Sequence, residues 1–86
     1  MDIDFLLLQR MKRGDENASD VFVRKYYKEI LNYCNYHCPD TSTAEDLTQE
    51  TFLRFFEKLS DYRYMGKTKN YLYTIAGNLC LSLIHI

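Results

Sequence analysis

The stretch from Ser42 to Leu59 has the clearest pattern of hydrophobic and polar positions in the chain, and it predicts an α-helix with two different faces. Apolar and small residues recur three and four positions apart, which is the spacing of a buried helical stripe. Ser42 and Glu45 have the spacing of a capping box, so we expect the helix to begin at Ser42. The residues of the buried stripe are Ala44, Leu47, Thr51, Phe52, Phe55, Phe56 and Leu59.

The opposite face of this helix carries acidic and polar side chains around one large aliphatic residue. An apolar centre surrounded by polar groups is typical of small protein–protein contacts, so this face is a candidate docking surface. A single exposed leucine is also common on ordinary helices, and the pattern alone leaves that alternative open. The residues of this face are Asp46, Gln49, Glu50, Leu53 and Glu57.

Three other segments are also predicted to be helical. Residues 2–13 place Asp2 and Asp4 in the first turn and bases in the last, as the helix dipole favours, and Gly14 ends the segment. A helix from about Asn17 to Cys38 is expected to bury Ala18, Phe22, Tyr26, Ile30, Tyr33 and Cys34 or His37. A last helix, from about Lys69, is expected to bury Leu72, Ile75, Ala76, Leu79 and Leu83.

These segments predict an all-α fold, a compact bundle of three to four helices, in a single domain covering residues 1–86. A chain of 86 residues is long enough for one small core. The net charge of −1 gives neither a nucleic-acid nor a membrane signature. The distribution is more informative, because acids concentrate between Asp40 and Asp61 whereas only bases follow Tyr62. One surface could therefore attract a basic partner and another a phosphate backbone.

Several functional classes are not expected from this sequence. Three cysteines without the features of a secretory signal predict a reducing, cytoplasmic location. The longest apolar run, Phe5 to Leu8, is too short for a membrane span. The chain has no Gly-rich phosphate loop, nucleophile elbow or paired-carboxylate motif, so we expect neither enzymatic activity nor a cofactor.

The segment that follows the central helix combines aromatic rings with positive charge. Single-stranded nucleic acid favours this mixture, because bases stack on rings and phosphates attract Lys and Arg. Thr74 and Asn78 share one side of the last helix, and an Asn amide can read a base edge. Alternatively, the tyrosines cover the core and the bases are only solvated; the residues alone leave both possibilities open. The aromatic and basic residues are Tyr62, Arg63, Tyr64, Lys67, Lys69 and Tyr71.

A metal site is a further alternative. Cys34, His37 and Cys38 have the spacing of one helix face, and Cys80 or His85 could supply a fourth ligand. Structural zinc sites usually draw their ligands from turns, so we expect no metal here. A small metal-binding helical protein is therefore the rival interpretation from a different functional class.

Two sequence blocks resemble region 2 of bacterial sigma factors, in particular the small extracytoplasmic-function type. They are AEDLTQETFLRFFEKL (residues 44–59) and NYLYTIAGNLC (residues 70–80), separated by the aromatic and basic loop. The first two predicted helices resemble the beginning of that region, so the resemblance covers essentially the whole chain. It implies a DNA-binding transcription initiation domain that recognises and melts the minus-ten promoter element.

The resemblance also implies a role for each surface. It implies that Asp46, Gln49, Glu50, Leu53 and Glu57 dock on the clamp helices of the largest subunit of core RNA polymerase. It implies that residues 60–69, with Tyr71, Thr74 and Asn78, capture a flipped base of the non-template single strand of promoter DNA. An anti-sigma factor is a further candidate partner.

The chain departs from the family pattern at several positions. Family members usually carry an aromatic and a basic residue at the positions of Thr68 and Gly77, and an Asp followed by arginines where this chain has Ser82, His85 and Ile86. These departures favour a rival, a degenerate sigma-like domain that binds only protein. The sequence also lacks the C-terminal promoter-binding domain that reads the minus-thirty-five element, so we expect it to be a piece of a longer protein.

Overall fold

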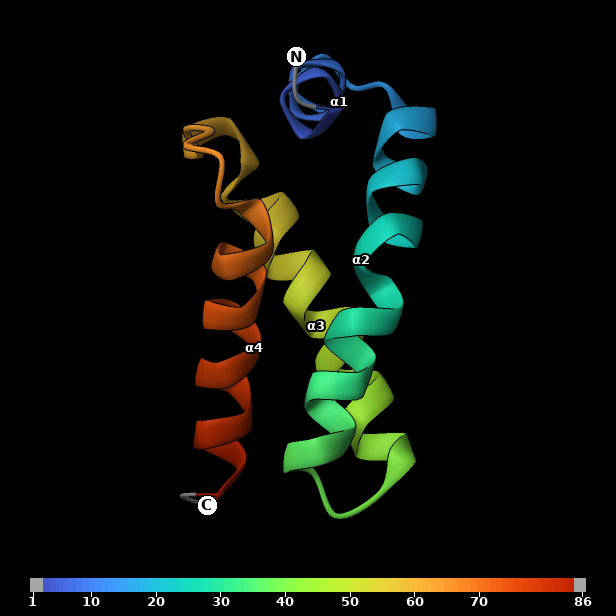
Figure 1. The fold of residues 1–86 in the computed structure, drawn as a ribbon, viewed down its shortest axis with the longest axis vertical. Helices are drawn as coiled ribbons and strands as arrows, with labels where there is room; N and C mark the ends of the chain where they lie inside the picture. Colours follow the sequence, from blue (N-terminus) through green and yellow to red (C-terminus); the bar gives the residue numbers. More distant parts are fainter. Residues whose placement is uncertain (1–2, 85–86) are drawn as a thin grey trace.

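The computed structural model describes residues 3–84, which form four α-helices and one short 3₁₀ helix. The elements are α1 (Ile3–Lys12), α2 (Glu16–His37), α3 (Thr41–Glu57), η1 (Leu59–Asp61) and α4 (Thr68–Ile84). Helices α2, α3 and α4 run along the length of the molecule, and α1 lies across one end of the bundle (Figure 1). The predicted all-α bundle is confirmed. Asp2, His85 and Ile86 lie outside the described residues.

Gly14 and Asp15 explain why α1 ends and where α2 begins. Gly14, predicted to end the first helix, has a φ of 87°, a conformation that favours glycine. The carboxylate of Asp15 then accepts hydrogen bonds from the backbone N–H groups of Asn17 and Ala18. These N–H groups have no partner within the helix, so Asp15 acts as the N-cap of α2.

The start of α3 corrects one prediction. Asp40, and not Ser42, occupies the N-cap position, and its carboxylate accepts a hydrogen bond from the backbone N–H of Thr43 at 3.0 Å. Ser42 lies within the helix, so the predicted capping box with Glu45 is wrong. Pro39 and Asp40 form the break itself, and the first available carboxylate satisfies the free N–H group.

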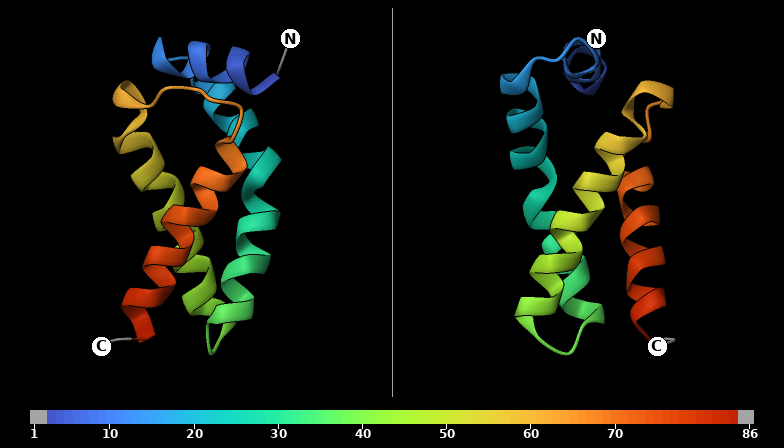
Figure 2. Two further views of the ribbon diagram at one scale, coloured as in Figure 1. Left: turned by 60° about the vertical axis from the view of Figure 1, so that its left-hand side comes forward. Right: turned by 180° about the vertical axis from the view of Figure 1, so that it is seen from behind.

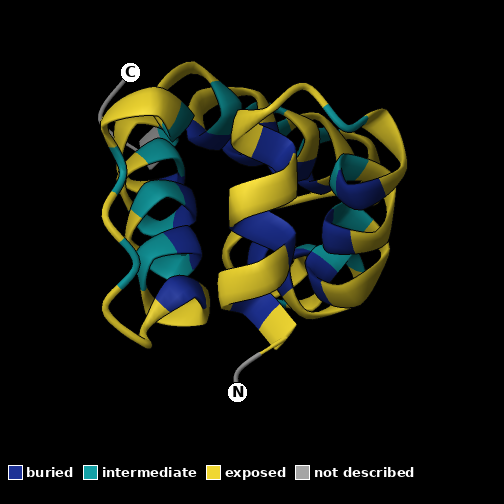
Figure 3. Cartoon of the chain, turned by 90° about the horizontal axis from the view of Figure 1, so that it is seen from above, coloured by how far each residue is buried: buried dark blue, intermediate teal, exposed yellow. Residues whose placement is uncertain are grey.

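The core lies between the helices, where buried positions face inward (Figure 3). Phe55 is fully buried near the middle of it, and its ring stacks on Phe22 of α2 with centroids 4.9 Å apart. The same ring meets Tyr71 of α4 edge-on at 5.8 Å. The stripe predicted for α3 is largely confirmed, although Leu47, Phe56 and Leu59 are half-buried and Thr48 is buried in addition.

The structure decides one open core assignment on α2 and corrects others, since Tyr33, predicted to be buried, is half-buried. Of the two candidates at the end of α2, Cys34 is fully buried and His37 is exposed, with its ring against those of Tyr33 and Tyr36. On α4 the buried line includes Cys80, whereas the predicted Ile75, Leu79 and Leu83 are half-buried. No helix within residues 3–84 is long and apolar enough to cross a membrane.

The connection from η1 to α4 runs close to α1 at one end of the bundle (Figure 2). Residues 62–67 of this connection have no helical hydrogen-bonding pattern. Lys12, in the last turn of α1, donates a hydrogen bond to the carbonyl oxygen of Tyr62 at 2.6 Å. The first helix therefore contacts the loop that the sequence singled out for its rings and bases.

Candidate functional site

The outer face of α3 is the first candidate surface, and Leu53 lies at its centre. The Leu53 side chain is 57% exposed, whereas Phe52 and Phe55 are 4% and 0% exposed. Asp46, Gln49 and Glu57 are exposed as well, and Glu50 is half-buried. This arrangement confirms which side of the helix faces the core. The acidic excess of the face is reduced at one point, because Arg54 lies 3.3 Å from the Glu50 carboxylate.

An apolar hollow of about 260 Å³ adjoins Leu53 on the side of α2. Val23 and Tyr27 of α2 form one wall, and residues of α3 form the other. Such a hollow can accept an apolar side chain from a partner helix. The sequence does not reveal this hollow, because its walls belong to two segments whose relative position depends on tertiary packing. The lining residues are Val23, Tyr27, Gln49, Phe52, Leu53 and Phe56.

The second candidate surface is built around Tyr62 and Tyr71. Their rings are in contact, with centroids 4.8 Å apart, and both also meet the Phe55 ring. Both tyrosines are half-buried, so each packs one side on the core and shows another to solvent. The structure thus combines the two interpretations of these rings, since they cover the core and still border the surface.

A hollow of about 280 Å³ opens beside these two rings. Exposed Arg63 and Lys67 border it from the loop, and Thr74 borders it from α4. Met65, within the predicted loop of residues 60–69, also lines it, and so does Asn70, which the sequence did not single out although it precedes Thr74 by one helical turn. The hollow therefore offers aromatic faces, two cations and polar hydrogen-bonding groups within one small volume. Its lining residues are Tyr62, Arg63, Met65, Lys67, Asn70, Tyr71 and Thr74.

Two of the predicted nucleic-acid residues point elsewhere. The Lys69 ammonium lies 3.3 Å from the Glu29 carboxylate of α2, and this ion pair joins the start of α4 to α2. The Tyr64 ring meets the Phe5 ring of α1, with centroids 6.0 Å apart. Neither residue lines the hollow beside Tyr62 and Tyr71.

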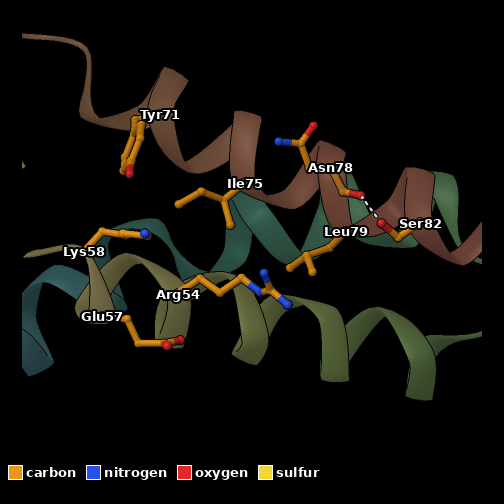
Figure 4. Close-up of a pocket in the computed structure, with 8 residues that line it drawn as sticks. All are labelled: Arg54, Glu57, Lys58, Tyr71, Ile75, Asn78, Leu79 and Ser82. Carbon is orange, nitrogen blue, oxygen red and sulfur yellow. Dashed lines mark hydrogen bonds between the residues drawn. The ribbon is translucent and has the colours of Figure 1, made fainter.

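Asn78 lines a separate groove of about 530 Å³ between α3 and α4. Ile75 and Leu79 point into this groove, and the Asn78 amide points away from α3 (Figure 4). Tyr71 borders both the groove and the hollow, so it connects Asn78 with the loop residues. Arg54 of α3 and Lys58, which directly follows α3, form the opposite wall and add positive charge to the groove. Their proximity to α4 depends on how the two helices pack.

The structure gives a physical account of the two unusual residues on α4. Thr68 is only 2% exposed, and its hydroxyl lies 3.4 Å from the Tyr62 hydroxyl. A Cβ atom at Gly77 would lie 3.0 Å from the Tyr33 hydroxyl, so the absence of a side chain lets Tyr33 pack closely on α4. Both residues serve packing.

The three cysteines come together as free thiols where the end of α2 meets α4. Burial, together with the neighbouring thiols of Cys34 and Cys38, raises the pKa of Cys80 to about 12. Burial also raises the pKa of the Cys38 thiol. His37 is exposed, and its ring contacts those of Tyr33 and Tyr36. Within residues 3–84, no group of three or more Cys, His, Asp or Glu side chains is arranged to hold a metal ion, and His85, the other candidate ligand, lies outside these residues.

Comparisons with known proteins identify relatives of most of the chain. Residues 22–85 match the sequence model of the family described as Sigma-70 region 2. The chain is 35% identical over 75 residues to the RNA polymerase sigma-H factor of Pseudomonas aeruginosa, and the alignment covers 87% of this chain and 39% of that protein. It is 42% identical over 66 residues to the RNA polymerase sigma factor YlaC of Bacillus subtilis, and this alignment covers 77% of this chain and 37% of that protein. The chain therefore spans about two fifths of the length of these relatives.

A solved structure has the same fold. A chain in the RsbN–BldN complex superimposes with a TM-score of 0.82 at 33% sequence identity, covering 87% of this chain and 55% of that chain. BldN of Streptomyces coelicolor, described as an ECF RNA polymerase sigma factor, is 35% identical over 74 residues. That alignment covers 85% of this chain and 28% of BldN.

Proposed function

Because this chain belongs to the sigma-70 region 2 family, we propose that it binds core RNA polymerase through α3 and captures single-stranded promoter DNA through the start of α4. The observation that carries the proposal is the separation of the two hollows. The hollow beside Leu53 and the hollow beside Tyr71 share no lining residue, so a protein and a nucleic-acid strand can occupy the domain together. Such joint occupancy is what a transcription initiation factor needs.

The proposed polymerase contact is the outer face of α3, comprising Asp46, Gln49, Glu50, Leu53 and Glu57. The partner would be the clamp helices of the largest polymerase subunit. In this proposal Leu53 is the apolar anchor, and the hollow beside it receives a side chain of the clamp. The exposed acids around it attract a basic partner and speed its association.

The proposed DNA contact combines stacking, charge and hydrogen bonding. A base of the minus-ten element on the non-template strand would enter the hollow beside Tyr71, with Arg63 and Lys67 placed for the phosphates. Thr74 and Asn78 would then contact base edges. Taking a base out of the duplex costs a few kcal/mol, and these contacts offset that cost. The domain would thus favour the melted promoter by binding it.

A further protein partner is also proposed. The matched solved structure is a complex of BldN with RsbN, which supports a regulatory partner of the anti-sigma type for this domain as well. Because its proposed partners are core RNA polymerase and promoter DNA, we propose that the protein is located in the cytoplasm.

The polymerase contact is tested by replacing Leu53. We expect Leu53→Asp to weaken binding to core RNA polymerase by at least about tenfold, the effect of losing an interface anchor, in a pull-down or by surface plasmon resonance. Leu81→Asp is the matched control, because Leu81 is 54% exposed on α4 and lies outside the proposed face. If Leu53→Asp and Leu81→Asp both bind like the unmodified chain, α3 is not the docking surface.

The DNA contact is tested with a short, fluorescein-labelled single-stranded oligonucleotide containing a minus-ten element. We expect Arg63→Met to weaken binding in fluorescence anisotropy. The salt slope, which is the slope of the logarithm of the binding constant against the logarithm of the salt concentration, should fall by about one, as expected for the loss of one phosphate contact. Lys28→Met is the matched control, because Lys28 is exposed on α2, away from the hollow. Asn78→Ala should lower the preference among base sequences more than it lowers overall affinity.

The opposite result would favour the protein-only domain. Lys69 is already paired with Glu29, and Tyr64 faces α1, so fewer groups are available to a nucleic acid than the sequence indicated. If the unmodified chain binds polymerase but no single-stranded DNA at low salt, the DNA part of the proposal is wrong.

A further inference from the structure

The first helix holds the loop that precedes α4, although α1 lies outside the residues that match the family. We define the capture loop as residues 62–67. Lys12 of α1 donates a hydrogen bond from Nζ to the Tyr62 carbonyl oxygen at 2.6 Å, across 50 positions of sequence. Phe5, seven residues earlier on α1, places its ring edge-on to the Tyr64 ring at 6.0 Å. Two residues of one helix thus contact two alternate residues of the loop.

These contacts alternate with exposed side chains along the loop. Tyr62 is held by Lys12 on its backbone and by Phe55 and Tyr71 on its ring, and Tyr64 faces Phe5. Tyr62, which follows η1, has an open backbone conformation with φ −74° and ψ 129°. Arg63, between the two tyrosines, is exposed, and Met65 is 79% exposed. The two residues that α1 contacts, Tyr62 and Tyr64, thus alternate along the loop with the exposed Arg63 and Met65.

The far end of the loop is constrained as well. Gly66 has a φ of 74°, which reverses the chain before α4 and favours glycine. A Cβ atom built at Gly66 would lie 3.9 Å from the Tyr64 hydroxyl, so this turn packs beside the same tyrosine that meets α1. Helix α1 thus contacts the capture loop at Tyr62 and Tyr64, and Gly66, near the end of the loop, lies beside Tyr64.

We infer that α1 is a positioning element that holds the capture loop in the conformation that binds DNA, with Lys12 and Phe5 as its positioning residues. The inference rests on the proposed function of the loop and adds to it an element outside the matched family region. Neither residue lines the hollow beside Tyr71, so both act through Tyr62 and Tyr64. A loop already held in its bound conformation loses less conformational entropy on binding, which increases affinity without adding a contact.

The first readout concerns the tether itself and needs no DNA. In the 86-residue chain, Lys12→Met and Phe5→Leu should each speed trypsin cleavage after Arg63 and Lys67, because a released loop reaches the protease more often. Phe5→Leu keeps an apolar side chain at a position that is already 40% exposed, so the variant should fold, as checked by circular dichroism. Lys28→Met should leave the cleavage rate unchanged. Equal cleavage rates in all four proteins would overturn the inference.

The second readout is binding of the labelled single-stranded minus-ten oligonucleotide. Each α1 variant should bind about three- to tenfold more weakly. The salt slope should stay unchanged, and Lys12→Arg should restore affinity because its guanidinium can also donate to the Tyr62 carbonyl. If Lys12→Met lowers the salt slope by about one while Phe5→Leu has no effect, Lys12 contacts a phosphate directly and the inference is wrong. If the unmodified chain binds no DNA while the proteolysis result holds, the proposed function fails and the structural tether stands.

Discussion

The carboxylate of Asp4 shows how a single residue holds two helices together. Its side chain is 8% exposed, and it accepts a hydrogen bond from Lys25 Nζ at 2.7 Å and another from the Tyr26 hydroxyl. Both partners belong to α2. The sequence indicated only a helix-dipole role for this acid in the first turn of α1. Removing a buried carboxylate that is paired in this way costs far more than losing a dipole interaction at the surface, because polar partners are left behind in a buried site.

We therefore predict that Asp4→Ala lowers the free energy of unfolding by about 2–4 kcal/mol, because the hydrogen bond from the Tyr26 hydroxyl and the ion pair with Lys25 are both lost. Urea denaturation followed by circular dichroism measures this change. Asp20→Ala is the control, since Asp20 is 61% exposed and paired with Arg24 at 3.2 Å, and it should change stability by less than about 1 kcal/mol. Similar losses in the two variants would contradict a special role for Asp4.

At the scale of one element, α3 combines a defined beginning with two unlike faces. The Thr43 hydroxyl and backbone N–H both donate to Asp40, which stabilises the charged carboxylate and holds the pKa of Asp40 below its ordinary value of 3.8. Because the pKa is lowered on folding, Asp40 binds its proton less tightly in the folded chain than in the unfolded chain. The stabilisation is therefore complete above the ordinary pKa and is lost as the pH falls through the folded pKa.

We predict that Asp40→Asn keeps the cap, because an Asn oxygen also accepts a hydrogen bond from Thr43, but loses the dependence on acid. Asp40→Ala should be less stable than both proteins at neutral pH. Thermal unfolding measured from neutral pH to below 3.8 should show the advantage of the unmodified chain over Asp40→Ala shrinking as Asp40 becomes protonated. An advantage that stays constant over this range would mean that the carboxylate charge does not contribute to the cap.

At the scale of the whole molecule, the thiol cluster marks where the end of α2 meets α4. Cys34 and Cys80 are 0% and 3% exposed, and Cys38 is half-buried at the end of α2. Burial and the neighbouring thiols make ionisation unfavourable, as the pKa of about 12 for Cys80 indicates. Neutral thiols are poor nucleophiles, so this cluster behaves as part of the apolar core.

The raised pKa predicts a loss of stability in alkali. The folded chain holds the Cys80 proton more tightly than the unfolded chain does. The free energy of unfolding therefore keeps its full value below pH 9.0 and falls as the pH rises from 9.0 toward about 12. Urea unfolding across this range should show a steeper decline for the unmodified chain than for Cys80→Ala. The two proteins have the same eight tyrosines, so the difference between the two curves isolates the thiol. Parallel curves would show that Cys80 ionises normally in the folded chain.

The helical elements could be predicted because their signals are local. The spacing that turns Phe52 and Phe55 inward and Leu53 outward lies within one segment, and the structure agrees with it. Gly14 likewise ends α1 as expected. The start of α3 was misplaced because two residues near Pro39 could each cap it, and sequence spacing does not decide which oxygen reaches the free N–H group.

The candidate sites could be predicted only in part. The sequence identified the loop by its rings and bases, yet Tyr64 faces α1 and Lys69 pairs with Glu29. Both outcomes depend on neighbours that are distant along the chain. The hollow beside Leu53 was missed for the same reason.

The amino-acid sequence by itself determined the helices, their inner and outer faces and the family, because helical periodicity and motif spacing are properties of neighbouring residues. The tertiary structure alone decided which side chains share a hollow, which cations are already paired, and that α1 holds the loop before α4. Contacts such as that between Lys12 and Tyr62 join residues far apart in sequence, and only the packing of whole helices brings their atoms within hydrogen-bonding distance.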